Sequence, residues 1–74
     1  MEDFYWKKRD TYYNPDYYVN PDGKIVGELS DSRFDNTWTA SGWDESEHRF
    51  ILLGRFINEE TAIQAVEEYC QDNY

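Results

Sequence analysis

The stretch that most constrains the fold is 49–66, which reads RFILLGRFINEETAIQAV. Its apolar run, FILL at 50–53, is bounded by Arg49 and Gly54. A short apolar run between turn signals favours a buried strand over a helix, which needs about ten residues or more. Gly54 predicts the end of this strand, because glycine adopts turn conformations at no steric cost.

The residues after this strand predict a capped helix. Asn58 is a suitable N-cap, since its side-chain oxygen can accept a hydrogen bond from an unpaired backbone N–H. Glu59 and Glu60 then fall in the first turn, where the helix dipole favours carboxylates. Apolar residues recur at spacings of three and four and form one stripe: Ala62, Ile63, Val66, Tyr69 and Cys70. We therefore expect one helix at 59–71.

The length of 74 residues indicates a single domain, 1–74, with a small core. The chain has a net charge of −9. Acidity and low hydropathy are also typical of disordered chains, but three Trp, seven Tyr and four Phe favour a folded domain. Cys70 is the only cysteine, which excludes a disulfide framework and a thiolate metal cluster. There is no signal-peptide segment and no apolar run of about 18 residues, so we expect a cytoplasmic protein that does not enter a membrane.

The first part of the chain, 1–18, is rich in aromatic residues and contains the basic run Lys7-Lys8-Arg9. Basic and aromatic residues together can bind a nucleic-acid strand by phosphate contact and stacking. The carboxylates around the run nearly cancel its charge: Glu2, Asp3, Asp10 and Asp16. We therefore favour an aromatic N-terminal arm or an edge strand over a nucleic-acid site.

Two turn signals follow, NPD at 14–16 and NPDG at 20–23. Proline presets φ at the second turn position, and glycine supplies the left-handed residue that closes a hairpin loop. The flanking residues have the composition of strands. In the segment 24–29, we expect Ile25 and Leu29 on one face.

The rest of the sheet region alternates between polar and strand-like segments: a loop at 31–36, a strand at 38–43 and an acidic connection at 44–47. This order of strands before a helix indicates an α+β fold. We expect a small antiparallel sheet of three to five strands, with its main part at 17–53, packed on one C-terminal helix.

The strand at 50–53 is apolar on both faces, with Ile51 and Leu53 on one and Phe50 and Leu52 on the other. A single helix covers only one face of a sheet. The other face must be covered by the aromatic arm, by a second copy of the chain in a homodimer, or by another partner. The arm is the simplest of these, and a homodimer is the next.

Part of the chain, 38–69, resembles known hairpin-helix domains. The matching residues are Trp38-Thr39-Ala40, Leu53-Gly54-Arg55-Phe56, Ala62 and Ala65. This pattern is similar to the plant ethylene-response-factor DNA-binding domain and to the arm-type domains of phage integrases. The resemblance implies a sheet packed on one helix. Those families bind DNA through a sheet face rich in Arg, Lys and Trp, whereas from residue 25 onwards this chain has three arginines against eleven carboxylates. Such a surface repels a DNA duplex. We therefore expect this chain to share the fold of those families but not their DNA binding.

The residues that catalysis requires are sparse. Acid–base catalysis needs groups held close together with tuned pKa values, and these carboxylates fall in predicted loops or on a solvated helix face. His48 is the only histidine, and Ser46 has no recognisable partner pattern. Asp44, Glu45 and Glu47 lack the spacing and the glycine of a calcium loop. We expect no enzyme activity, no cofactor and no metal.

The acidic residues predict a different function, the inhibition of a protein that processes nucleic acid. They lie on the non-core side of the predicted helix and in the predicted loops: Glu59, Glu60, Glu67, Glu68, Asp72, Asp44, Glu45, Glu47, Asp31 and Asp35. Residues four apart on a helix rise by ~6 Å, so the helix can present a ladder of negative charge that imitates DNA. Such a surface can occupy the basic groove of a nuclease or CRISPR effector. As a small acidic domain, the chain resembles phage proteins of the anti-CRISPR or anti-restriction type.

Two alternatives stay open. The aromatic N-terminal third can serve as a protein–protein interaction module, since Tyr and Trp often anchor interfaces. The chain can also be a weak nucleic-acid binder through residues 7–9, although its net charge makes direct nucleic-acid binding unfavourable. Imitation of DNA predicts binding that weakens steeply with salt, whereas an aromatic interface tolerates salt.

Overall fold

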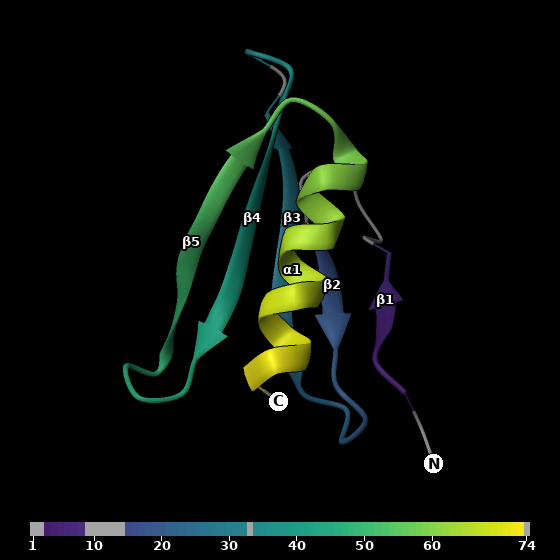
Figure 1. The fold of residues 1–74 in the computed structure, drawn as a ribbon, viewed down its shortest axis with the longest axis vertical. Coiled ribbons are helices and arrows are strands. Elements are labelled where there is room, and N and C mark those ends of the chain that lie inside the picture. The colour runs from purple at the N-terminus through teal and green to yellow at the C-terminus, as the bar shows by residue number, and fades with distance from the viewer. Residues whose placement is uncertain (1–2, 9–14, 33, 74) are drawn as a thin grey trace.

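The fold is one sheet with a helix packed against it (Figure 1). The computed structural model describes residues 3–8, 15–32 and 34–73, and in these residues the chain forms five strands and one helix. The elements are β1 (Tyr5–Lys7), β2 (Asp16–Val19), β3 (Ile25–Ser32), β4 (Thr37–Asp44), β5 (Arg49–Phe56) and α1 (Glu59–Asn73). The strands lie in the order β1-β2-β3-β4-β5, and each pairs antiparallel with the next. The predicted α+β fold class is confirmed.

The boundary between β5 and α1 differs from the prediction at one glycine. Gly54 does not end the strand, because it pairs with Ala40 beside a bulge and β5 continues beyond it. A bulge adds one residue to a strand and lets the pairing resume. The predicted helix cap is confirmed, since Asn58 Oδ1 accepts hydrogen bonds from the Thr61 backbone N–H at 2.9 Å and the Thr61 hydroxyl at 2.7 Å.

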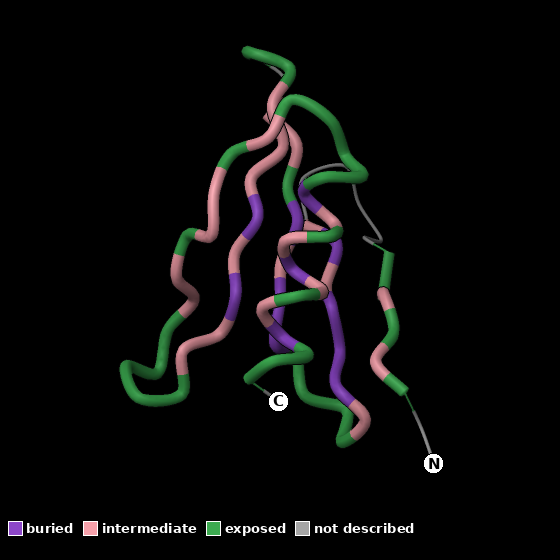
Figure 2. Tube along the Cα trace, in the orientation of Figure 1, coloured by how far each residue is buried: buried purple, intermediate pink, exposed green. Residues whose placement is uncertain are grey.

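The core lies between α1 and one face of the sheet, where Figure 2 shows the buried segments of both. Its fully buried residues come from the two layers: Val26, Leu29, Ala40, Ala62, Val66 and Cys70. Gly27 and Gly42 are register partners in β3 and β4, and both face α1. A Cβ on Gly27 would lie 2.5 Å from Val66 Cγ1. The helix therefore sits close to the sheet only because these two positions have no side chain.

The aromatic arm contributes the edge strand β1. Trp6 pairs with Tyr18, and their ring centroids are 4.8 Å apart. Phe4 stacks on the same tyrosine at 5.3 Å. The indole Nε1 of Trp6 donates a hydrogen bond to Glu67 Oε2 of α1 at 3.0 Å. These rings lie on the helix side of the sheet, and the strand itself extends the sheet at its edge. The expectation that the arm covers the other face is therefore wrong for residues 3–8, which add only Tyr5 and Lys7 to that face.

A second bulge decides which residues of β3 share a face. Val19 pairs with Ile25 while its neighbour in β2 pairs with Gly27, which leaves Val26 as the extra residue. The prediction that Ile25 and Leu29 lie on one face is therefore wrong. Leu29 is buried beneath α1, whereas Ile25 is 37% exposed.

The turn between β2 and β3 is organised by Asn20. Its Oδ1 accepts hydrogen bonds from the backbone N–H of Asp22 at 3.1 Å and of Lys24 at 2.9 Å. Gly23 has φ = 87°, a conformation that favours glycine. The turn predicted at this position is confirmed.

Three other predicted segments differ from the structure or lie partly outside the described residues. The loop expected at 31–36 is shorter, because β3 extends into it. The turn expected at 14–16 and the end of the basic run at Arg9 fall partly outside the described residues. Within that run, Lys8 Nζ lies 3.6 Å from the carboxylate of Asp16.

Candidate functional site

The side of the sheet away from α1, which we call the open face, is formed by alternate residues of the strands. One row of register partners crosses it: Lys7, Tyr17, Glu28, Ser41 and Leu52. Their neighbours Gly27 and Gly42 face α1. Because successive residues of a strand point to opposite faces, the row lies on the far side from the helix.

Most large side chains on the open face are apolar. They are Tyr5, Tyr17, Ile25, Trp43, Phe50 and Leu52. Tyr5 is 52% exposed and Leu52 is 63% exposed. A sheet of this kind normally has polar residues on its solvated face. The open face is therefore unusually apolar for a surface in contact with water.

A hollow of about 330 Å³ opens on this face, and we call it the aromatic hollow. Its walls bring together β2, β3, β4, β5 and the β2–β3 turn: Tyr17, Lys24, Ile25, Glu28, Trp43 and Phe50. The volume is at the small end of the ~300–1,000 Å³ that ligand pockets occupy. It suits a single side chain better than a large ligand.

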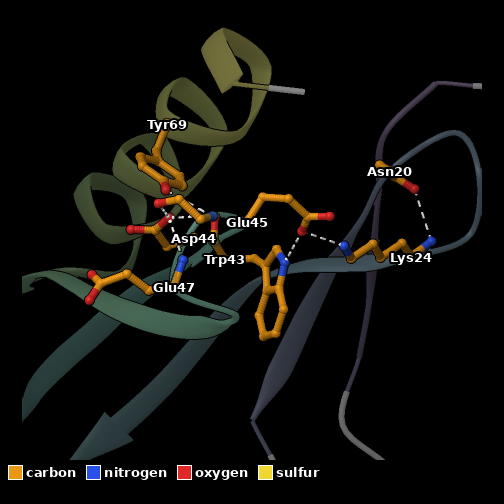
Figure 3. Close-up of polar contacts among 8 residues, drawn as sticks. Asn20, Lys24, Trp43, Asp44, Glu45, Glu47 and Tyr69 are labelled. Atoms are coloured by element: carbon orange, nitrogen blue, oxygen red, sulfur yellow. Dashed lines mark hydrogen bonds and ion pairs between the residues drawn. The ribbon is translucent and has the colours of Figure 1, made fainter.

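Trp43 forms one wall of the aromatic hollow and is held from several sides, and Figure 3 shows its polar contact with Glu45. Its ring meets Phe50 edge-on, with centroids 5.2 Å apart and planes at 73°, and it contacts His48 at 6.3 Å. Lys24 Nζ lies 5.1 Å from the ring centroid. The indole Nε1 donates a hydrogen bond to Glu45 Oε2, which also forms an ion pair with Lys24 Nζ at 2.7 Å. The Trp43 ring and the Lys24 ammonium, which Glu45 holds in place, thus lie side by side.

Glu28 is the carboxylate of the aromatic hollow. Burial raises its pKa above the ordinary value of 4.5, because a partly buried carboxylate loses hydration that its charged form needs. Among the described residues, no group donates a hydrogen bond to this carboxylate and no cation pairs with it. The described part of the chain therefore compensates the charge of Glu28 poorly.

The variant Glu28→Gln is expected to be more stable than the natural protein at pH 7 and to show no such gain at pH 3. A raised pKa means that the folded state binds this proton more tightly than the unfolded chain does. Glu28 therefore destabilises the fold as the pH rises from about 4.5 through its folded pKa. Urea unfolding of both proteins at the two pH values measures the difference.

Glu68→Gln is the matched control for the loss of one negative charge, since Glu68 is exposed on α1. A gain at pH 7 that is equally large in Glu68→Gln would assign the effect to net charge. It would then contradict the role of burial at Glu28.

The acidic residues predicted as binding residues in the hairpin 44–47 all have partners within the fold, and Glu45 is held by Trp43 and Lys24 as described above. Asp44 Oδ1 accepts hydrogen bonds from the Ser46 hydroxyl at 2.7 Å and from the backbone N–H of Ser46 at 2.9 Å and of Glu47 at 3.3 Å. These hydrogen bonds, led by that of the Ser46 hydroxyl, lower the pKa of Asp44. Glu47 forms an ion pair with Arg49 at 3.4 Å. The charge of Asp44 thus stabilises the turn itself, whereas Glu47 pairs with β5.

The predicted binding residues of α1 fall into two groups. Four are exposed: Glu59, Glu60, Glu68 and Asp72. Glu60, Glu68 and Asp72 are separated by multiples of four, so they form an exposed acidic row that rises by about 18 Å. Glu67 is different, because its carboxylate is partly buried and accepts the hydrogen bond of Trp6. Glu67 attaches the edge strand to the helix and lies outside the row.

The last two predicted binding residues, Asp31 and Asp35, lie where β3 connects to β4. Figure 1 shows this connection at the opposite end of the sheet from the one between β4 and β5, which contains 44–47. Asp31 belongs to β3 and pairs with Trp38. Asp35 accepts hydrogen bonds from the Thr37 hydroxyl at 2.7 Å and the Thr37 backbone N–H at 3.2 Å, which lower its pKa. The ten acidic residues are thus spread over several surfaces, and as binding residues they stay predictions.

The aromatic hollow is the feature that sequence reasoning missed. Its residues are far apart in the chain, from Tyr17 to Phe50. One signal pointed towards it, because the strand at 50–53 is apolar on both faces. The position of the hollow could not be derived, since it depends on the bulge that places Ile25 beside Glu28.

The remaining groups of chemical interest are the metal-ligating side chains and the single thiol. Among them, no group of three or more His, Cys, Asp or Glu is placed to hold a metal ion. Burial raises the pKa of the Cys70 thiol to about 12, and its Sγ lies 3.3 Å from the Val26 carbonyl oxygen. The thiol is therefore protonated at neutral pH and is a poor nucleophile. No helix in the described part of the chain is long and apolar enough to span a bilayer.

Comparisons of the chain with protein-family models, with curated proteins and with solved structures each found no match. The resemblance of 38–69 to DNA-binding hairpin-helix domains therefore stays a prediction.

Proposed function

We propose that this protein is a non-enzymatic acidic inhibitor that binds a nucleic-acid-processing protein, with the open face as its main contact surface. The observation that carries this proposal is the apolar character of the open face on a chain with a net charge of −9. Exposed aromatic and aliphatic side chains gathered on one face are typical of surfaces that bind proteins. Aromatic residues in particular anchor such interfaces.

The charge of the chain selects the class of partner. A chain with a net charge of −9 repels nucleic acid and is attracted to basic surfaces, which also speeds its association. Proteins that process nucleic acid have such surfaces, because Lys and Arg hold the phosphates. A small domain bound over such a surface blocks the nucleic acid without any chemical step.

A second candidate contact surface is the exposed acidic row of α1, which can imitate the charge of DNA. The observation in its favour is the exposure of Glu60, Glu68 and Asp72 along one side of the helix. This row and the open face lie on opposite sides of the sheet. The two candidates can therefore be separated by substitutions that affect only one side.

The experiment compares three immobilised proteins: the natural chain, Leu52→Asp, and the double variant Glu68→Lys with Asp72→Lys. Each is incubated with bacterial lysate, with and without excess duplex DNA, and retained proteins are identified by mass spectrometry. We expect the natural chain and the double variant to retain a nucleic-acid-processing protein that DNA displaces. We expect Leu52→Asp to lose it.

Leu52→Asp is informative because it makes the chain more negative, so general attraction to a basic protein would strengthen. Its loss of binding must then come from the apolar contact.

Loss in the double variant alone would move the contact to the acidic row. Failure of the natural chain to retain any nucleic-acid-processing protein would contradict the proposal. A dimer in light scattering that Leu52→Asp dissociates would instead place a second copy of the chain on the open face.

A further inference from the structure

The aromatic hollow has the composition of a site for a cation. The faces of aromatic rings attract cations, Trp most strongly. Trp43 and Phe50 meet at 73°, so they form two walls of the hollow, and Tyr17 adds a third ring. Lys24 Nζ already lies 5.1 Å from the Trp43 ring centroid. The hollow thus already accommodates a cation beside this ring.

Glu28 supplies the opposite charge inside the same hollow. Its carboxylate is partly buried and receives no hydrogen bond from the described residues. Burying a charge is unfavourable unless donors compensate for the lost water. A group that brings both a positive charge and N–H donors would remove this cost, so the hollow favours a cationic ligand over a neutral one.

Lys24 does not fill this role. Its ammonium is held at 2.7 Å by Glu45, which is exposed at the end of the sheet (Figure 3). The described residues show no ion pair between Lys24 and Glu28. Lys24 and Glu28 thus both line the hollow, but they do not form an ion pair with each other.

We propose that the aromatic hollow receives one arginine side chain of the partner protein, with the guanidinium against Trp43 and paired with Glu28. This inference rests on the proposed function, because the partner's basic surface supplies the arginine. Arginine suits the site better than lysine, since its guanidinium is planar, stacks on aromatic rings and pairs with a carboxylate through two N–H groups. It is also more weakly hydrated than an ammonium, which lowers the cost of entering an apolar hollow.

The experiment titrates the whole chain with three small probes, the amides of N-acetyl-arginine, N-acetyl-lysine and N-acetyl-norleucine. NMR follows the indole N–H signal of Trp43, which is assigned by its absence in Trp43→Phe, and the backbone N–H of Glu28. We expect the tightest binding for the arginine probe, weaker binding for lysine and the weakest for uncharged norleucine. Equal binding of arginine and norleucine would overturn the inference, and equal binding of arginine and lysine would overturn the choice of arginine.

Two variants test the residues themselves. Glu28→Gln is expected to weaken binding of the arginine probe by roughly fivefold, and unfolding is not the cause because this variant is expected to be more stable at pH 7. Lys24→Gln is expected to tighten binding, since the competing ammonium is removed from Trp43. Arg55→Gln is the matched control, because it also removes one positive charge but does not line the hollow. Unchanged binding in Glu28→Gln, or equal tightening in Arg55→Gln, would overturn the inference.

The probe titration and the lysate experiment can fail separately. If the natural chain retains its partner and Leu52→Asp loses it, but the arginine probe does not shift the Trp43 signal, the proposed function stands and the arginine site is wrong. If the probe binds as expected and no nucleic-acid-processing protein is retained, the hollow is a cation site and the proposed function is wrong.

Discussion

Replacing Leu29 with alanine is expected to cost about 2–5 kcal/mol of unfolding free energy. Leu29 is 1% exposed and lies in the core between the sheet and α1. Its removal leaves a cavity that the surrounding backbone of β3 and β4 cannot close, so packing is lost as well as burial. A core of this size rarely supplies more than about 3–5 kcal/mol. Leu29→Ala should therefore be largely unfolded or close to its unfolding midpoint at 25 °C.

Leu52→Ala is the matched control, because it makes the same chemical change on the other side of the sheet. Leu52 is 63% exposed on the open face. We expect its substitution to change stability by no more than about 0.5 kcal/mol. Urea unfolding monitored by tryptophan fluorescence measures both variants. Similar losses at the two positions would show that the open face is covered in solution.

Gly27→Ala is expected to destabilise the protein by about 1–3 kcal/mol, although alanine normally suits a folded chain better than glycine. The added Cβ would lie 2.5 Å from Val66 Cγ1, 3.0 Å from Tyr18 Cβ and 3.3 Å from Cys70 Sγ. Valine in a helix is held in one rotamer, so it cannot turn away from the contact. The helix must then move off the sheet and lose contact along its buried side.

Ser30→Val provides the comparison for Gly27→Ala. Ser30 lies on β3 but is exposed on the opposite face from Gly27. Added bulk there meets water, and valine favours a strand, so we expect a change of no more than about 0.5 kcal/mol. The same denaturant titration measures this pair. A Gly27→Ala variant as stable as the natural chain would show that the contact between α1 and β3 is looser than described.

Much of the fold could be predicted from local patterns. The cap at Asn58 and the stripe of Ala62, Val66 and Cys70 are short-range signals, because one helix turn contains all the groups that they need. The turn at 20–23 is equally local, since Pro and Gly restrict their own φ angles. The bulges in β3 and β5 were missed because a bulge depends on the partner strand as well as on its own residues.

The candidate site could be predicted only in part. The acidic residues are visible in the sequence as a charge, but the sequence does not show that Asp44 binds its own turn or that Glu67 is bonded to Trp6. Such contacts join residues up to 61 positions apart. The distribution of charge over the surface thus follows from the fold and not from composition.

The sequence by itself determined the elements of this protein, its acidic charge and the presence of more apolar surface than one helix can cover. Each of these depends on the residue types and their spacing within a few turns or strand residues. Only the tertiary structure decided which face stays open and that Tyr17, Glu28, Trp43 and Phe50 meet in one hollow there. The physical reason is register: a single extra residue in a strand reverses which side chains face the core, and that choice is made between strands.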